Sequence, residues 1–134
     1  MTGSGWQGIA DRVPRRLWHQ NLSLLRDKRL HRMLTLAGHE LRFGLPKPGD
    51  GVLVWGHSPT AWRGETLARR HNLPLIRVED AFLRSIHPGR FRGEAPLGLL
   101  VDPVGMHFNA AGPSLLEQVL QSPDVQNSNI RDRA

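Results

Sequence analysis

The chain contains no cysteine among its 134 residues. Disulfides, thiolate metal sites and a cysteine nucleophile are therefore excluded, and the composition is compatible with a reducing compartment. A metal would have to be held by histidines and carboxylates, but the seven histidines are scattered and show no HExxH spacing. We expect no metal site and interpret the histidines singly as surface or hydrogen-bonded groups.

Long apolar runs are also missing. No stretch approaches the ~20 apolar residues that a membrane-spanning helix needs. The first residues, 1–6, lack the apolar core of a secretory signal peptide. The sequence therefore predicts a cytoplasmic protein.

The chain has no dense basic block, although 18 Lys and Arg against 12 Asp and Glu give a formal charge of +6. Such a charge suits nucleic acid, an anionic membrane face or a phosphorylated ligand. The arginines are spread from Arg12 to Arg133, with no zinc-ligand pattern and no RNA-binding aromatic signature. This distribution argues against nucleic acid as a partner.

The hydrophobic pattern predicts one α/β domain. A hydrophobic content of 39% supports a modest core, too small for a two-domain enzyme. Residues 18–39 have the apolar spacing of a helix, with a break near 26–28. The pattern also predicts two buried strands, at 52–56 and 73–78, with a helix at 60–70 between them. This β-α-β order indicates a parallel sheet.

Further elements are expected after this unit. Two strands at 97–101 and 106–109 flank a turn, and a helix at 115–120 begins after Ser114, with Glu117 at the capping-box position. We expect an amino-terminal polar and helical extension over 1–28, an α/β domain over 29–121 and a disordered tail over 122–134.

Paired carboxylates at the end of the second buried strand are the main candidate site. Glu79 and Asp80 follow an apolar run, and Arg84 and Ser85 come shortly after. Ligands of open α/β sheets bind outside the carboxyl ends of the strands. This position favours a catalytic role for Glu79 and Asp80. Arg84 and Ser85 are then candidates for binding the substrate. Because neighbouring strand residues point to opposite faces, one carboxylate should face the cleft. The alternative is an exposed ion pair that closes a loop.

The turn after the first buried strand is a second candidate. Gly56, His57 and Ser58 lie where a Rossmann-like phosphate loop begins, so His57 and Ser58 are candidate ligand contacts. The GxGxxG fingerprint is missing, which favours a plain strand-to-helix turn. Ser58 also lacks the GxSxG context of a hydrolase nucleophile.

Four segments in order resemble the bacterial capsule polysaccharide biosynthesis and export family. They are VWGHSPTA at 54–61, VEDAFLRS at 78–85, PLGLLVD at 96–102 and GMHFNA at 105–110, and the likeness runs from about residue 29 to residue 120.

The resemblance implies a retaining glycosyltransferase that moves Kdo from CMP-Kdo to a lipid-linked glycan acceptor. It also implies that the enzyme acts at the cytoplasmic face of the inner membrane and has capsule assembly proteins as partners. It implies the Rossmann-like parallel-sheet half-lobe of a GT-B enzyme, with an amino-terminal helical segment. CMP-Kdo is then the donor, and no separate cofactor is expected.

The chain also departs from the family. Asn109 stands where the family usually has aspartate, Ala81 where many members have glycine, and no second, nucleotide-holding lobe follows. We therefore expect an amino-terminal fragment that is inactive alone and self-associates. The alternative is a non-catalytic module that associates with capsule assembly or makes peripheral contact with an anionic membrane.

Overall fold

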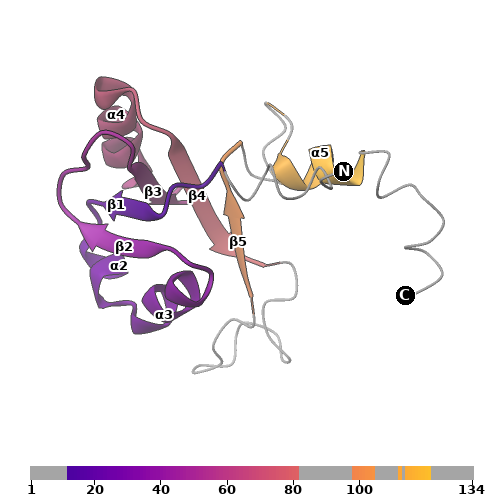
Figure 1. The fold of residues 1–134 in the computed structure, drawn as a ribbon, viewed down its shortest axis with the longest axis horizontal. Helices are drawn as coiled ribbons and strands as arrows, with labels where there is room; N and C mark the ends of the chain where they lie inside the picture. The colour runs from indigo at the N-terminus through magenta and orange to yellow at the C-terminus, as the bar shows by residue number, and fades with distance from the viewer. Residues whose placement is uncertain (1–11, 82–97, 105–111, 113, 122–134) are drawn as a thin grey trace.

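The computed structural model describes residues 12–81, 98–104, 112 and 114–121 (Figure 1). Five strands form one sheet in the order β2-β1-β3-β4-β5. The strands are β1 Arg16–His19, β2 Glu40–Phe43, β3 Gly51–Trp55, β4 Leu75–Asp80 and β5 Leu99–Asp102, and the helices are α2 Leu22–Arg26, α3 Lys28–Leu36, α4 Ala61–His71 and α5 Leu115–Leu120. The first four strands pair in parallel, and β5 pairs antiparallel with β4. The expected α/β fold with a parallel sheet is confirmed over β1 to β4, whereas the antiparallel β5 was not expected.

Helices cover both faces of the sheet, with α4 on one side and α2 and α3 on the other (Figure 1). The larger apolar core lies under α2 and α3, where Leu24, Leu30 and Leu34 pack against β-strand residues such as Leu53 and Ile76. A smaller core on the other face joins Leu67 and Ala68 of α4 to Val52 of β3. Residues 52, 53 and 54 are all buried because β3 is covered on both faces.

The predicted β-α-β unit is confirmed with small shifts in its ends. Helix α4 ends at His71 and is capped by Asn72, which adopts a left-handed conformation with φ of 51° and donates its backbone N–H to carbonyls of the last turn. Strand β4 extends to Asp80, two residues beyond the predicted end. Both candidate carboxylates therefore belong to the strand itself.

The amino-terminal part differs most from expectation. The predicted helix over 18–39 is wrong at its start, because Arg16–His19 form β1, between β2 and β3 in the sheet. Leu17 and His19 are fully buried and alternate with more accessible neighbours, as in a strand. The predicted break is confirmed at Asp27, whose side chain accepts hydrogen bonds from the backbone N–H groups of Arg29 and Leu30. The sheet therefore includes residues that the predicted 1–28 extension had set apart.

The carboxyl-terminal part is described only in pieces. Asp102 accepts from the backbone N–H of Val104 at 2.7 Å and of Leu115 at 2.8 Å, so it orders its own turn and connects β5 to α5. The predicted capping box is confirmed: Ser114 Oγ accepts from the Glu117 N–H at 3.1 Å, and Glu117 Oε2 accepts from the Ser114 N–H at 2.7 Å. The strand predicted at 106–109 and the tail over 122–134 lie outside the described residues.

Within the described part of the chain, no helix has the length and apolar character needed to cross a membrane.

Candidate functional site

The carboxyl ends of β1 and β3 form the topological switch point of the sheet. From β1 the chain passes through α2 and α3 to β2 on one side, and from β3 it passes through α4 to β4 on the other. Connections that leave neighbouring strands in opposite directions open a crevice between them, and open α/β sheets bind ligands there. A small hollow of about 10 Å³, room for about one water molecule, occupies this place. We call it the switch-point hollow; its lining is Gln20, Asn21, Leu24, Leu53, Val54, Trp55, Ser58, Thr60, Ala61, Arg63 and Gly64.

Side chains from two loops meet across this hollow. Asn21, which caps α2, donates from Nδ2 to Thr60 Oγ1 at 3.1 Å, and Thr60 Oγ1 lies 3.3 Å from Ser58 Oγ. Thr60 makes no side-chain cap at the start of α4. The hollow is therefore lined by amide and hydroxyl groups and bordered by Arg63. Donors and acceptors of these kinds suit a ligand rich in hydroxyl groups that also carries an acid.

Arg77 holds the β3–α4 turn in place from the neighbouring strand. Its guanidinium donates to the carbonyl of Gly56 at 2.6 Å and pairs with Glu65 of α4 at 2.6 Å. Both partners are partly shielded from water, with side-chain exposures of 15% for Arg77 and 29% for Glu65. One residue of β4 thus connects the strand, the turn and the helix that border the hollow.

Gly56 is required at this turn for two reasons. Its φ of 41° lies in the left-handed region that glycine adopts without strain. A Cβ at this position would also collide with the carboxylate of Glu79. The absence of a side chain at Gly56 therefore lets the Glu79 carboxylate lie against the turn.

The structure places the two candidate carboxylates on opposite faces of β4. Glu79 pairs in register with Leu100 and Asp80 with Leu99, so both are regular strand residues. Glu79 lies beside the β3–α4 turn, whereas Asp80 points to the face of α2 and α3. Neither residue lines the switch-point hollow. Arg84 and Ser85, the predicted substrate-binding residues, lie outside the described residues.

Of the two turn residues predicted to contact ligand, Ser58 lines the hollow and His57 does not. Ser58 also shapes the turn: its N–H donates to the Trp55 carbonyl at 3.0 Å, and its carbonyl accepts from the Ala61 N–H at 2.9 Å. His57 is exposed at the start of the loop. The strand-to-helix turn was predicted correctly, and its role in ligand binding stays a prediction.

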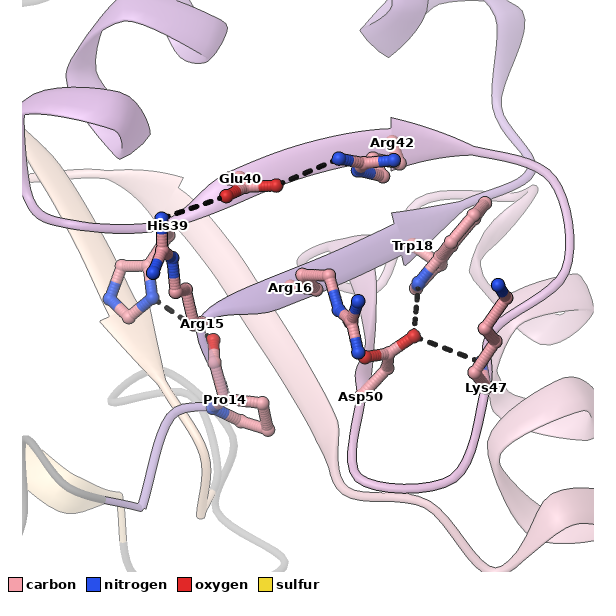
Figure 2. Close-up of polar contacts among 9 residues, drawn as sticks. All are labelled: Pro14, Arg15, Arg16, Trp18, His39, Glu40, Arg42, Lys47 and Asp50. Atoms are coloured by element: carbon pink, nitrogen blue, oxygen red, sulfur yellow. Dashed lines mark hydrogen bonds and ion pairs between the residues drawn. The ribbon is translucent and has the colours of Figure 1, made fainter.

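A polar network lies at the opposite, amino edge of the sheet (Figure 2). The carboxylate of Asp50, 1% exposed, accepts from Arg16 Nε at 2.8 Å, Trp18 Nε1 at 2.7 Å and the Lys47 N–H at 2.9 Å. Burial alone raises the pKa of Asp50, but these hydrogen bonds and the Arg16 charge outweigh it and leave the pKa below its usual value. Asp50 thus joins the starts of β1 and β3.

Glu40, in the same region, pairs with two arginines. Arg15 Nη2 lies 3.1 Å and Arg42 Nη2 2.9 Å from its carboxylate (Figure 2). The hydrogen bond from Arg42 is the largest influence that lowers the pKa of Glu40. This exposed cluster connects neighbouring strands and lies away from the switch-point hollow.

The residues that sequence reasoning missed follow the unrecognised strand β1. Gln20 and Asn21 reach the hollow because they come directly after His19, at the carboxyl end of β1. The alternation of Arg16, Leu17, Trp18 and His19 was the available signal for a strand. Arg63 gave no signal beyond its place in the first turn of α4.

Among the residues that the structure describes, no group of three or more histidine or acidic side chains could hold a metal ion.

The chain is similar to known proteins in both sequence and fold. Residues 50–133 match the model of the family described as capsule polysaccharide biosynthesis protein. The capsule polysaccharide modification protein LipA of Neisseria meningitidis serogroup B is 35% identical over 88 residues, covering 66% of this chain and 12% of LipA. The lipopolysaccharide-processing protein LpsZ of Rhizobium meliloti is 40% identical over 86 residues, covering 63% and 19% of the two chains.

A solved structure, Thermosulfurimonas dismutans KpsC, beta Kdo 2,4 transferase, superimposes with a TM-score of 0.66 and 31% identity. The match covers 87% of this chain and 37% of the KpsC chain. This chain therefore spans a minor part of each of these relatives. Because the family model covers more than half of the sequence, the chain belongs to the capsule polysaccharide biosynthesis protein family.

Proposed function

We propose that this chain forms the acceptor-facing part of a Kdo transferase that acts in capsule biosynthesis. The observation that carries the proposal is the structural similarity to a beta-Kdo transferase over 87% of the chain. In this proposal a second lobe completes a GT-B enzyme and holds the nucleotide of CMP-Kdo. The acceptor is a lipid-linked glycan at the cytoplasmic face of the inner membrane, where capsule assembly proteins receive the product.

In this proposal the acceptor sugar lies over the mouth of the switch-point hollow, where the surrounding side chains have the chemistry that it requires. A Kdo residue carries several hydroxyl groups and one carboxylate. Asn21 and Ser58 offer hydrogen bonds to hydroxyl groups, and Arg63 offers a guanidinium for the carboxylate. The described lining contains no acidic side chain that would repel an acidic sugar.

In this proposal the acid–base chemistry comes from β4, the strand that pairs with β3. Glu79 is the better placed of the two candidate carboxylates, because it lies against the turn that carries Ser58. Arg77 keeps that turn in register through the Gly56 carbonyl. Asp80, on the other face, remains a candidate for the same site, as do Arg84, Ser85 and His57 for substrate contact.

A fluorescence titration tests the proposed ligand class. Trp55 lines the hollow and reports on what binds over it. We expect the methyl glycoside of Kdo to change the tryptophan emission with saturation in the millimolar range, and methyl glucoside to have no effect. Trp55→Phe should abolish the change.

Two variants that each remove one arginine show whether Arg63 contacts the sugar or whether the net charge of the protein alone attracts it. Arg63→Gln should weaken Kdo glycoside binding about tenfold or more, as expected for a lost charge-assisted hydrogen bond of ~1.5–3 kcal/mol. Arg32→Gln, which removes an exposed arginine from α3, should leave binding unchanged. Equal binding of both sugars, or equal losses in the two variants, would refute the proposal.

A further inference from the structure

A second open groove lies along the outer side of α4. Its volume is about 450 Å³, and its lining combines residues of α4 with Gln20 and Leu45, one from each of two loops. The α4 residues are Trp62, Arg63, Thr66, Leu67, Arg70 and His71. The α4 residues of this lining form two adjacent stripes along the helix, because residues four positions apart lie on the same face. One stripe contains positions 62, 66 and 70, and the other contains positions 63, 67 and 71. We call this surface the α4 groove.

Large apolar side chains are exposed at the α4 groove. Trp62 is 59% exposed and Leu45 is 65% exposed. The Arg63 guanidinium lies 5.6 Å from the centre of the Trp62 ring, an arrangement that keeps the charge and the indole on the same surface. Leu45 precedes a Pro-Lys-Pro segment, which restricts the loop that presents it.

The charge of the groove has one sign. Arg63 and Arg70 line it, and His71 is the last residue of the helix. No acidic side chain of the described residues lines it, and the only acid on α4, Glu65, pairs with Arg77 of β4. None of the ion pairs found in the described part of the chain involves Arg63 or Arg70.

We propose that the α4 groove is a docking surface for an anionic phospholipid bilayer. An exposed tryptophan and leucine surrounded by arginines match an interface in which apolar side chains enter the headgroup region and cations meet lipid phosphates. A soluble anion would use the arginines and leave Trp62 and Leu45 in water. The combination therefore favours a lipid surface.

The position of the groove adds a consequence for the proposed transferase. Gln20 and Arg63 line both the α4 groove and the switch-point hollow, so the two surfaces are continuous. A bilayer on the α4 groove places the hollow next to the headgroups, where a lipid-linked glycan begins. This consequence rests on the proposed function, whereas the docking itself does not.

Vesicle flotation tests the docking with the 134-residue chain. The probe is a vesicle of phosphatidylcholine with 30% phosphatidylglycerol, compared with phosphatidylcholine alone, in 50 mM and 500 mM salt. We expect flotation with the anionic vesicles at low salt and little with either vesicle at high salt, because salt screens surface charge. Equal binding to neutral vesicles, or none to the anionic ones, would overturn the proposal.

Two double variants locate the surface. Arg63→Gln/Arg70→Gln should weaken anionic-vesicle binding by about thirtyfold, the effect of removing two cations from a membrane-facing surface. Arg26→Gln/Arg32→Gln makes the same charge change on α2 and α3, across the sheet, and should change binding less than threefold. Similar losses in both variants would mean that net charge alone attracts the chain, which would contradict a specific surface.

Quenching by brominated lipid provides an independent measurement. Trp62 should be quenched on docking, so the parent chain should lose more emission than Trp62→Phe. Because Trp62 is exposed, this variant should keep the parent melting temperature. Equal quenching in both proteins would show that Trp62 does not reach the lipid and would overturn the assignment of this surface.

Vesicle binding without sugar binding would leave the docking standing and the proposed transferase role refuted.

Discussion

His19 is the residue whose environment is least expected from its type. Its side chain is fully buried, and neither ring nitrogen makes a well-formed hydrogen bond. The ring meets Phe43 edge to face at 5.5 Å between centroids and His31 at 6.3 Å. A buried polar group without a partner costs about 1–3 kcal/mol of stability. Burial is the largest influence on the pKa of His19 and lowers it. The Asn21 backbone raises the pKa and the charge of His31 lowers it, and the net result is a pKa below the usual value.

The lowered pKa predicts that acid destabilises the domain through His19. Between the folded pKa and the unfolded value of about 6.5, the unfolded chain binds the proton and the folded chain does not. The contribution of neutral His19 to the free energy of unfolding is therefore fully present above pH ~6.5 and is lost as the pH falls toward the folded pKa. His19→Leu should remove this contribution, so its free energy of unfolding should fall less between pH 7 and pH 5 than that of the parent.

Urea unfolding at the two pH values checks this prediction. At pH 7 the His19→Leu variant should be at least as stable as the parent, because no unsatisfied nitrogen remains. An unchanged pH dependence in His19→Leu would show that other groups cause the acid sensitivity.

Gly56 supports a second prediction at the residue scale. Gly56→Ala and Gly38→Ala both place alanine at a positive φ, which costs about 1–2 kcal/mol. Only at Gly56 does the new Cβ meet another side chain, Glu79, whereas nothing lies within 4 Å of it at Gly38. Gly56→Ala should therefore lower the free energy of unfolding more than Gly38→Ala.

A double-mutant cycle identifies the cause of the difference. In a Glu79→Ala background the extra cost of Gly56→Ala should shrink toward the Gly38→Ala value, because the collision is removed. If the extra cost persists without the Glu79 side chain, the close approach of the carboxylate to the turn is not its origin.

At the scale of elements, the β3-α4-β4 unit was predictable and the first two strands were not. Strand β3 is a continuous apolar run because it is buried on both faces, and such runs are distinctive. Strands β1 and β2 have four residues each, and Trp18 joins smoothly to the helical spacing that follows. The antiparallel direction of β5 depends on a long connection that local patterns do not describe.

Packing between α4 and the sheet gives a prediction at this scale. Gly64 faces β3, and a Cβ there would collide with Val54 Cγ1 and lie 3.3 Å from Val52 Cγ1. Alanine gains about 1 kcal/mol over glycine in a helix, but overpacking a tight contact costs about 1–3 kcal/mol. Gly64→Ala should therefore lower the melting temperature.

Relief of the contact is the control. Val54→Ala removes the methyl groups that a Cβ at Gly64 would meet, so Gly64→Ala should be less harmful in that background than in the parent. A Gly64→Ala variant that melts above the parent would show that α4 has room to move away from β3.

At the scale of the whole molecule, the site was predictable in part. The turn containing Ser58 was placed correctly because strand and helix signals adjoin it, and Ser58 lines the switch-point hollow. The contribution of Asn21 was not foreseen, because it follows a strand that was read as helix. The meeting of the β1 and β3 ends depends on strand order, which no local pattern in this chain encodes.

The edge of the sheet predicts self-association. In the described residues β2 is an edge strand, and its last residue, Phe43, is 46% exposed. An edge strand presents unpaired backbone N–H and C=O groups, and an exposed apolar side chain such as Phe43 favours its pairing with another chain. Size-exclusion chromatography with light scattering should show concentration-dependent association of the parent that Phe43→Lys reduces. Leu36→Lys, which adds the same charge on exposed α3, should have a smaller effect, and equal effects would exclude β2 as the contact.

The isolated chain should not release CMP from CMP-Kdo in the presence of a Kdo-terminated acceptor. Transfer needs donor and acceptor held in one geometry, and in the proposed arrangement the donor belongs to another lobe. A coupled assay for CMP measures this directly. Turnover above the rate without protein would show that the chain holds the donor by itself.

Amide chemical shifts show whether a Kdo glycoside binds at the carboxyl ends of the strands, at the switch-point hollow. The ¹⁵N-labelled chain is titrated with the methyl glycoside of Kdo. We expect saturable shifts centred on Asn21, Ser58 and Arg63, and no shifts at Arg16, Glu40 and Asp50 at the amino ends of the strands. Shifts centred on the amino edge, or no shifts at tens of millimolar glycoside, would contradict it.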